Sequence, residues 1–179
     1  MRIIGGNFKG KKILEPKDKE TRPLKDLTKE SIFNIINHSN KFSIDLEKSY
    51  VLDLFSGTGS FGLECLSRKA KHVCFVENYM GILPILKNNL SNLKTVKNYS
   101  IIEKNILIEI DFLEKKEKFD IIFLDPPYKE KEINTILNNL SKFKTLKPEG
   151  IIIIHRHKKE IDNFPDKFKI IEEKKYGIS

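Results

Sequence analysis

The fold is decided by the stretch Val51-Leu52-Asp53-Leu54-Phe55-Ser56-Gly57-Thr58-Gly59-Ser60-Phe61-Gly62. Its apolar first half is short, which is typical of a buried strand in a parallel sheet. The glycines that follow permit positive φ and a close approach of the main chain to a ligand. We therefore expect a strand, a glycine-rich turn and then a helix, an order found at the ligand sites of open α/β sheets.

The same alternation of strand and helix continues along the chain, which predicts an α/β fold: a mostly parallel twisted sheet with helices on both faces. The expected strands are Val51–Phe55, His72–Glu77, Ser100–Glu103, Phe119–Leu124 and Ile151–Ile154. The expected helices are Leu27–Ile36, Phe61–Ser67, Ile82–Leu93, Leu107–Lys115 and Lys131–Leu146. Residues 147–150 should form a turn before the last strand.

A chain of 179 residues is long enough for one α/β domain. We expect residues 26–179 to form this domain and residues 1–25 to form a small basic N-terminal β-hairpin as an appendage. The net charge of +8 partly reflects an abundance of lysine, so the placement of the charge is more informative than its total. The residues in the N-terminal segment that we expect to contact an anionic partner are Lys9, Lys11, Lys12 and Arg22.

Disulfide, metal and membrane functions have little support in the sequence. Cys65 and Cys74 are the two cysteines of the chain, and we expect both to be core thiols in a reducing compartment. His155 and His157 alternate at the end of the last expected strand, and with no third ligand in view we predict that both face solvent. No apolar stretch approaches the roughly 20 residues of a membrane span, so we expect a cytoplasmic protein.

The carboxyl ends of the first three expected strands carry residues suited to a cofactor. A buried carboxylate at Asp53 suits a ligand with an ammonium and a sulfonium, such as S-adenosylmethionine. Glu77 ends the second strand, where a carboxylate can accept from both ribose hydroxyls, and the amide of Asn105 could face an adenine edge. The candidate cofactor-binding residues are Asp53, Ser56, Gly57, Gly59, Glu77 and Asn105.

Two other interpretations of this region remain open. The spacing of Gly57, Gly59 and Gly62 also matches a dinucleotide fingerprint, which would fit a nicotinamide-dependent oxidoreductase. In such sites the first glycine usually follows the strand directly, whereas Asp53 lies four residues before Gly57. Asp53 could alternatively be an acid that caps the helix or bonds to the turn.

The fourth expected strand ends in Asp125-Pro126-Pro127-Tyr128. Two consecutive prolines make a stiff loop that cannot donate backbone hydrogen bonds. A carboxylate and a prolyl carbonyl can together accept the N–H groups of a planar amine and turn its lone pair outward, while the aromatic ring stacks on the base. This block therefore favours chemistry on the exocyclic amine of a nucleobase. The simpler alternative is a strand that stops at proline, followed by a surface tyrosine.

These motifs resemble the bacterial 16S rRNA guanine-N(2) methyltransferases of the RsmD type. The glycine turn and the Asp-Pro-Pro-Tyr block are shared by many amino-methyltransferases, so the N-terminal block is the more specific part of the match. The matching blocks are residues 1–10, 21–23, 31–35, 51–59, 62–64, 66–68, 75–77, 123–128 and 174–177.

The resemblance implies a seven-stranded, Rossmann-like class I methyltransferase that uses S-adenosylmethionine to methylate one guanine of small-subunit rRNA. It assigns the cofactor candidates to the methyl donor, Asp125 to Tyr128 to the target guanine, and the basic hairpin with Arg22 to RNA phosphates. The expected partner is 16S rRNA or the small ribosomal subunit, and the expected state is a monomer.

The chain also departs from this family. Residues 78–81 read Asn-Tyr-Met-Gly where polar or charged residues are usual, so we expect a different rim around the adenine. The chain stops where the family's last strand would begin, which indicates a truncated chain or a sheet that lacks one strand. Two alternative functions remain: an amino-methyltransferase acting on DNA adenine or protein glutamine, and a non-catalytic RNA-binding assembly factor.

Overall fold

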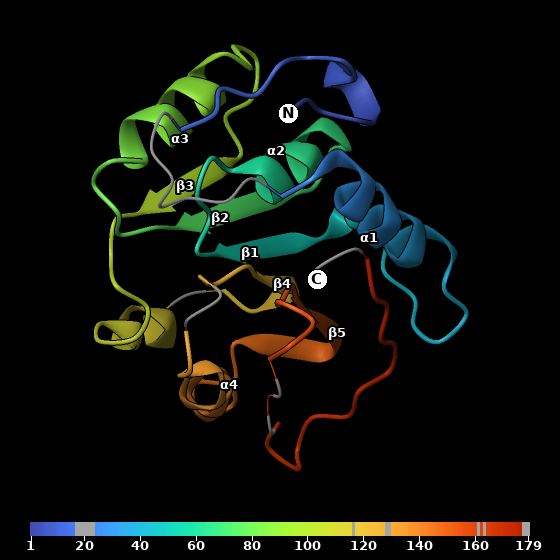
Figure 1. The fold of residues 1–179 in the computed structure, drawn as a ribbon, viewed down its shortest axis with the longest axis vertical. Helices are drawn as coiled ribbons and strands as arrows, with labels where there is room; N and C mark the ends of the chain where they lie inside the picture. The colour runs from blue at the N-terminus through green and yellow to red at the C-terminus, as the bar shows by residue number, and fades with distance from the viewer. Residues whose placement is uncertain (17–23, 116, 128–129, 161, 163, 177–179) are drawn as a thin grey trace.

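The computed structural model describes residues 1–16, 24–115, 117–127, 130–160, 162 and 164–176. Its centre is a five-stranded sheet in the order β3-β2-β1-β4-β5, in which every neighbouring pair is parallel (Figure 1). The strands are β1 (Tyr50–Leu54), β2 (His72–Val76), β3 (Tyr99–Ile102), β4 (Phe119–Leu124) and β5 (Leu146–Ile154).

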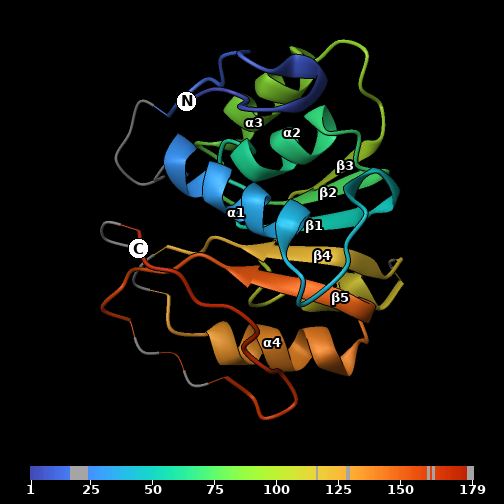
Figure 2. The same cartoon turned by 90° about the vertical axis from the view of Figure 1, so that its right-hand side faces the viewer.

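Helices cover both faces of this sheet, as Figure 2 shows from the side. One face packs against α1 (Asp26–His38), α2 (Ser60–Ser67) and α3 (Leu83–Ser91), and the other against α4 (Ile133–Lys142) and the short 3-10 helix η3 (Ile110–Lys115). Successive strand residues point to opposite faces, so Val51 and Phe123 join the first core while Leu52 and Leu124 join the second. The predicted fold class is confirmed.

Two predicted elements differ from the structure. The expected helix over residues 107–115 is wrong: a turn leads into η3. The side-chain oxygen of Asn105 accepts the N–H of Leu107 (2.9 Å), which gives the backbone an alternative to an α-helix. The expected turn at residues 147–150 lies inside β5, where Phe119 pairs with Leu146 but Ile121 with Ile151. Those residues form an irregularity in the strand rather than a turn before it.

The sheet that the resemblance implied has seven strands, whereas the described residues form five. Residues 164–176 contain no strand. This segment is joined to α1 and the loop after it, because Ser31 donates to the hydroxyl of Tyr176 and Lys41 pairs with Glu172 (2.5 Å). The last segment of the described chain therefore lies beside a helix instead of extending the sheet.

The N-terminal segment folds back on itself through a single antiparallel bridge between Arg2 and Lys12, with a 3-10 turn (η1, Gly6–Phe8) at its far end. Ile3 and Ile13 are fully buried and belong to the same core as α2 and α3. This burial holds the segment against the main body of the protein. The division of the chain at residue 25 stays a prediction.

The close packing of α2 on β2 makes Gly62 sensitive to substitution. A Cβ at this position would lie 2.2 Å from the ring of Phe75. We expect Gly62→Ala to lower the free energy of unfolding by about 1–3 kcal/mol, because an overpacked core must shift to accept the methyl group. Urea denaturation followed by circular dichroism measures this change.

The control is the double-mutant cycle with Phe75→Leu, which removes the ring that the new methyl group meets. The second substitution should recover part of the loss, with a coupling energy above about 0.5 kcal/mol. Strict additivity of the two changes would contradict this explanation.

Candidate functional site

The carboxyl ends of β1 and β4 mark the point where the strand order reverses, with β2 and β3 on one side and β5 on the other (Figure 1). Asp53 lies one residue before the end of β1, and Asp125 follows β4 directly. Glu77 follows β2. Ligands of open α/β sheets bind in the crevice outside this edge. The structure therefore brings three carboxylates from three separate parts of the sequence to one location.

Asp53 is buried, with 1% of its surface exposed. Its carboxylate accepts the N–H of Gly62 in α2 (3.0 Å). Burial raises the pKa of Asp53 well above its usual value; the bond from Gly62 partly opposes this, and the charges of Asp125 and Glu77 add to the rise. This bond agrees with the alternative interpretation of the sequence, in which Asp53 is an acid that bonds to the glycine-rich turn or the helix after it. A buried carboxylate among like charges is also a favourable place for a ligand cation.

The glycine-rich turn is held in place by Ser56. The Ser56 hydroxyl donates to the carbonyl of Asp53 (2.6 Å) and accepts the N–H of Val76 (3.0 Å), so it ties the turn to β1 and β2. Gly57 and Gly59 have φ values of 55° and 82°, in the left-handed region that favours glycine. A Cβ at Gly59 would lie 2.6 Å from Leu86. Ser56 shapes the turn, and Gly59 is required both by φ and by its neighbour.

Glu77 orients the same turn from the next strand. One oxygen of its carboxylate accepts the N–H of Gly57 (2.8 Å), and the other accepts those of Asn78 (2.9 Å) and Tyr79 (2.8 Å). A carboxylate offers about four acceptor positions, and backbone groups use three of them here. The oxygen bonded to Gly57 keeps one acceptor position for a ligand hydroxyl.

Asn105 shapes the loop after β3. Its main-chain N–H donates to the carboxylate of Glu109 (3.1 Å), while its side-chain oxygen is bonded within the turn. The side-chain NH₂ is therefore the group of Asn105 that can face a ligand. Large exposed apolar side chains follow β2 and β3 at this edge, namely Met80 (74% exposed) and Ile108 (80% exposed).

The loop after β4 is held by two residues that follow β5. The carboxylate of Asp125 lies 2.7 Å from Nδ1 of His155. Arg156 donates to the carbonyl of Glu130 (2.8 Å) and lies near that of Pro127 (3.5 Å), while its other N–H groups bind Asp162 (2.9 and 3.1 Å). Pro126 and Pro127 lie in the sequence between Asp125, which contacts His155, and Glu130, which contacts Arg156. Tyr128 lies outside the described residues.

The prediction that His155 faces solvent is wrong, since 15% of its side chain is exposed and it pairs with Asp125. Sequence reasoning also missed Arg156. Both residues follow β5. The order of strands in the sheet places β5 beside β4 rather than beside β3 at the opposite edge. The available signal was the apolar strand that ends directly before them, because the end of a strand at a switch point is a ligand-facing position.

The basic candidates do not gather at this edge. Helices α2 and α3 run opposite to the strands, so their last residues lie at the amino end of the sheet. The N–H of Phe8 donates to Ser67, the last residue of α2, and Lys11 donates to the carbonyl of Asn92 beyond α3. Lys9 is exposed beside this far end. Lys12 is exposed at the bridge to Arg2, and Arg22 lies outside the described residues.

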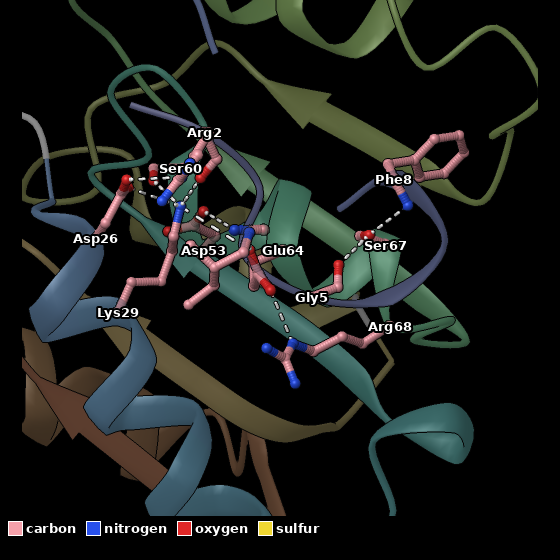
Figure 3. Close-up of polar contacts among 12 residues, drawn as sticks. Arg2, Gly5, Phe8, Asp26, Lys29, Asp53, Ser60, Glu64, Ser67 and Arg68 are labelled. Atoms are coloured by element: carbon pink, nitrogen blue, oxygen red, sulfur yellow. Dashed lines mark hydrogen bonds and ion pairs between the residues drawn. The ribbon is translucent and has the colours of Figure 1, made fainter. Parts of the chain in front are cut away.

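A buried charge cluster joins the N-terminal segment to α2 (Figure 3). Lys29 of α1 is fully buried and donates to the carbonyl of Arg2 (2.7 Å) and to the hydroxyl of Ser60 (3.2 Å). Glu64 accepts from the N–H of Ile4 (2.8 Å) and from Arg68 (2.8 Å). Burial lowers the pKa of Lys29, and the charge of Glu64 opposes that shift. Ser60 begins α2, so this cluster reaches the glycine-rich turn.

A second bridge reaches the same turn. The side chain of Asn89 in α3 accepts the N–H of Leu14 (2.8 Å) and donates to the carbonyls of Leu14 (3.1 Å) and Thr58 (3.0 Å). Thr58 lies between the two glycines.

Among the residues that the structure describes, no group of three or more His, Cys, Asp or Glu side chains could hold a metal ion. No helix within the described ranges is long and apolar enough to cross a membrane.

The chain is similar over nearly its whole length to bacterial methyltransferases. Residues 1–179 match the model of a family described as conserved hypothetical protein 95. The ribosomal RNA small subunit methyltransferase D of Haemophilus influenzae is 32% identical over 99% of this chain and 90% of that protein. The protein of the same name from Escherichia coli strain K12 is 30% identical over 91% and 76%. The solved structure of a proposed methyltransferase from Escherichia coli, 28% identical, covers 99% of this chain and 93% of its own with a TM-score of 0.81.

The raised pKa of Asp53 predicts how stability depends on pH. Below the unfolded-state pKa, about 4, the carboxyl is protonated in both states. As the pH rises above that value the unfolded chain ionises first, so the free energy of unfolding falls until the folded-state pKa is passed. Asp53→Asn should remove this decline and make the ligand-free protein more stable than the wild type at neutral pH. Urea denaturation between pH 4.5 and 8 would measure both curves.

The control is Asp111→Asn, which removes an exposed carboxylate from η3. Its pH curve should keep the decline of the wild type. A curve for Asp53→Asn that runs parallel to that of the wild type would show that Asp53 is not the group responsible.

Proposed function

Because the chain belongs to the family of the ribosomal RNA small subunit methyltransferases D, we propose that it transfers the methyl group of S-adenosylmethionine to the exocyclic amine of a guanine in 16S rRNA. The observation that carries this proposal is the position of Asp53 and Asp125 at the ends of adjacent strands, on the two sides of the switch point. A cofactor beside one carboxylate and a base beside the other would meet there. We further propose that the protein acts as a monomer in the cytoplasm.

The residues around Asp53 fit this cofactor. The buried carboxylate, whose pKa is raised by burial and by its acidic neighbours, would be stabilised by the ammonium of the methionine moiety. The positive φ values of Gly57 and Gly59 let the main chain of the turn approach the ligand closely. Glu77 would accept a ribose hydroxyl at its remaining acceptor position, and the NH₂ of Asn105 would face the adenine. S-adenosylmethionine supplies an electrophilic methyl group on a sulfonium.

The loop after β4 would bind the guanine amine. Such an amine is a poor nucleophile because its lone pair is delocalised into the ring, and two acceptors on its N–H groups turn that lone pair outward. One carboxylate oxygen of Asp125 is bonded to His155, which leaves the other for the amine. The carbonyl of Pro127 already accepts the N–H of Glu130 (2.8 Å), so we assign the second acceptor to the carbonyl of Pro126. This arrangement works by positioning and electrostatics.

The proposal is tested by methyl transfer from labelled S-adenosylmethionine to small ribosomal subunits isolated from a strain that lacks the modification. Mass spectrometry of the product nucleosides should identify a guanine methylated on its exocyclic amine. Binding of the cofactor without transfer to subunits or to free 16S rRNA would reject this substrate. Methylation of an adenine or of a protein instead would move the chemistry to another substrate.

Replacing Asp125 should separate catalysis from cofactor binding. We expect Asp125→Ala to lower kcat by roughly 10²–10³-fold, the usual effect of removing one preorganised polar contact to the reacting group. The affinity for S-adenosylmethionine, measured by calorimetry, should stay within about threefold of the wild type, since Asp125 faces the substrate side. Asp111→Ala serves as the control and should keep full activity. An equal loss of cofactor affinity in Asp125→Ala would place this residue in the cofactor site instead.

The exposed lysines of the N-terminal segment should contribute to RNA binding through phosphates. The double variant Lys9→Gln with Lys12→Gln removes two exposed charges. The slope of log K against log[salt] should become less steep by about 1.4–1.8, the amount expected for the loss of two phosphate contacts. Filter binding of 16S rRNA fragments at several salt concentrations measures the slope. The matched control is Lys142→Gln with Lys144→Gln, beside α4 on the opposite face of the sheet. Equal slopes for the two double variants would remove the N-terminal segment from the RNA interface.

A further inference from the structure

His155 lies against the residue expected to bind the substrate amine. Its main-chain N–H donates to the carbonyl of Leu124 (2.9 Å), the residue before Asp125. Its ring Nδ1 lies 2.7 Å from a carboxylate oxygen of Asp125, and the two side chains are 15% and 20% exposed. The other ring nitrogen, Nε2, is buried, and no hydrogen-bond partner for it occurs among the described residues. The pair is therefore largely shielded from water at the edge where the chemistry would take place.

The surroundings of the two ring nitrogens select one form of the imidazole. An ionised carboxylate can only accept a hydrogen bond, so Nδ1 must carry the proton that is shared with Asp125. The tautomer with its proton on Nε2 instead would set the lone pair of Nδ1 against the carboxylate and leave a buried donor without an acceptor, which is costly. The hydrogen-bond geometry thus favours the Nδ1–H tautomer, in which the imidazole donates to the carboxylate of Asp125.

We infer that His155 is a positioning residue for methyl transfer, an inference that rests on the function proposed above. Its Nδ1–H holds one oxygen of Asp125, which fixes the rotation of the carboxylate and aims the second oxygen at the amine. Because the carboxylate of Asp125 only accepts in this bond, its second oxygen remains available to accept an N–H of the amine. Arg156, the next residue, binds the carbonyl of Glu130 and so holds the far end of the same loop. His155 and Arg156 thus hold Asp125 and Glu130, the two ends of the loop after β4.

The test compares His155→Ala with His155→Asn, because the amide nitrogen of asparagine occupies nearly the place of Nδ1 and can donate the same hydrogen bond. His155→Ala should lower kcat by about 10²-fold, the effect expected of a misplaced reacting group. The affinity for S-adenosylmethionine and the KM for small subunits should change by less than about threefold. His155→Asn should recover kcat to within about fivefold of the wild type. His157→Ala, two residues further along, is the matched control and should behave as the wild type.

A rate for His155→Asn as low as that of His155→Ala, or a full rate for His155→Ala, would overturn the inference. Long-range ¹H–¹⁵N correlation spectra of the histidine rings test the pair without an activity assay. The wild type should show His155 as the Nδ1–H form, and Asp125→Ala should lose that preference. An Nε2–H form in the wild type would overturn the inference even if methylation were confirmed. If the wild type transfers no methyl group but shows the Nδ1–H form, the proposed function fails while the pairing stands, and the positioning role in methyl transfer is rejected.

Discussion

The parallel pairing of β1 with β4 is the constraint on which the rest of the structure depends. In the strand order it joins the first three strands of the chain to the last two, and its register sets Leu54 beside Leu124. Asp53 and Asp125 reach the same edge for this reason alone, since about 70 residues separate them in the sequence. A shift of one residue would turn Asp53 from the face of α2 to the face of α4. Burial of apolar side chains on both faces of the two strands prevents such a shift.

The electrostatics of this edge indicate a site that is preorganised at the expense of stability. Three carboxylates lie close enough that Asp125 and Glu77 contribute to the raised pKa of Asp53. Like charges in a buried location disfavour the folded state unless a cation or a proton relieves them. Each carboxylate is also held by hydrogen bonds: Asp53 by Gly62, Glu77 by three main-chain N–H groups, and Asp125 by His155. The side chains are thus oriented before any ligand binds, which lowers the entropic cost of binding.

The N-terminal segment is connected to the glycine-rich turn more closely than its sequence position suggests. Lys29 links the carbonyl of Arg2 to Ser60, and Asn89 links Leu14 to Thr58. Both bridges are buried or partly buried, so loss of one partner would leave an unsatisfied polar group. The segment that carries the basic side chains therefore also supports the main chain of the proposed cofactor site. Its tip, in contrast, lies at the amino end of the sheet beside Ser67.

The sequence by itself determined the succession of strands and helices along the chain, the glycine turn and the three carboxylates at strand ends. These features follow from local rules: the period of apolar residues, and the backbone freedom of glycine at positive φ. Local rules failed where a side chain competed with the helix, as at Asn105, and where an irregular strand began early, as at residues 147–150. Only the tertiary structure decided that His155 and Arg156 hold the loop after β4, that Lys29 is buried against Glu64, and that the tip of the basic segment lies far from the acidic edge. Each of these contacts joins residues whose proximity depends on strand order and helix direction, which no local pattern of residues specifies.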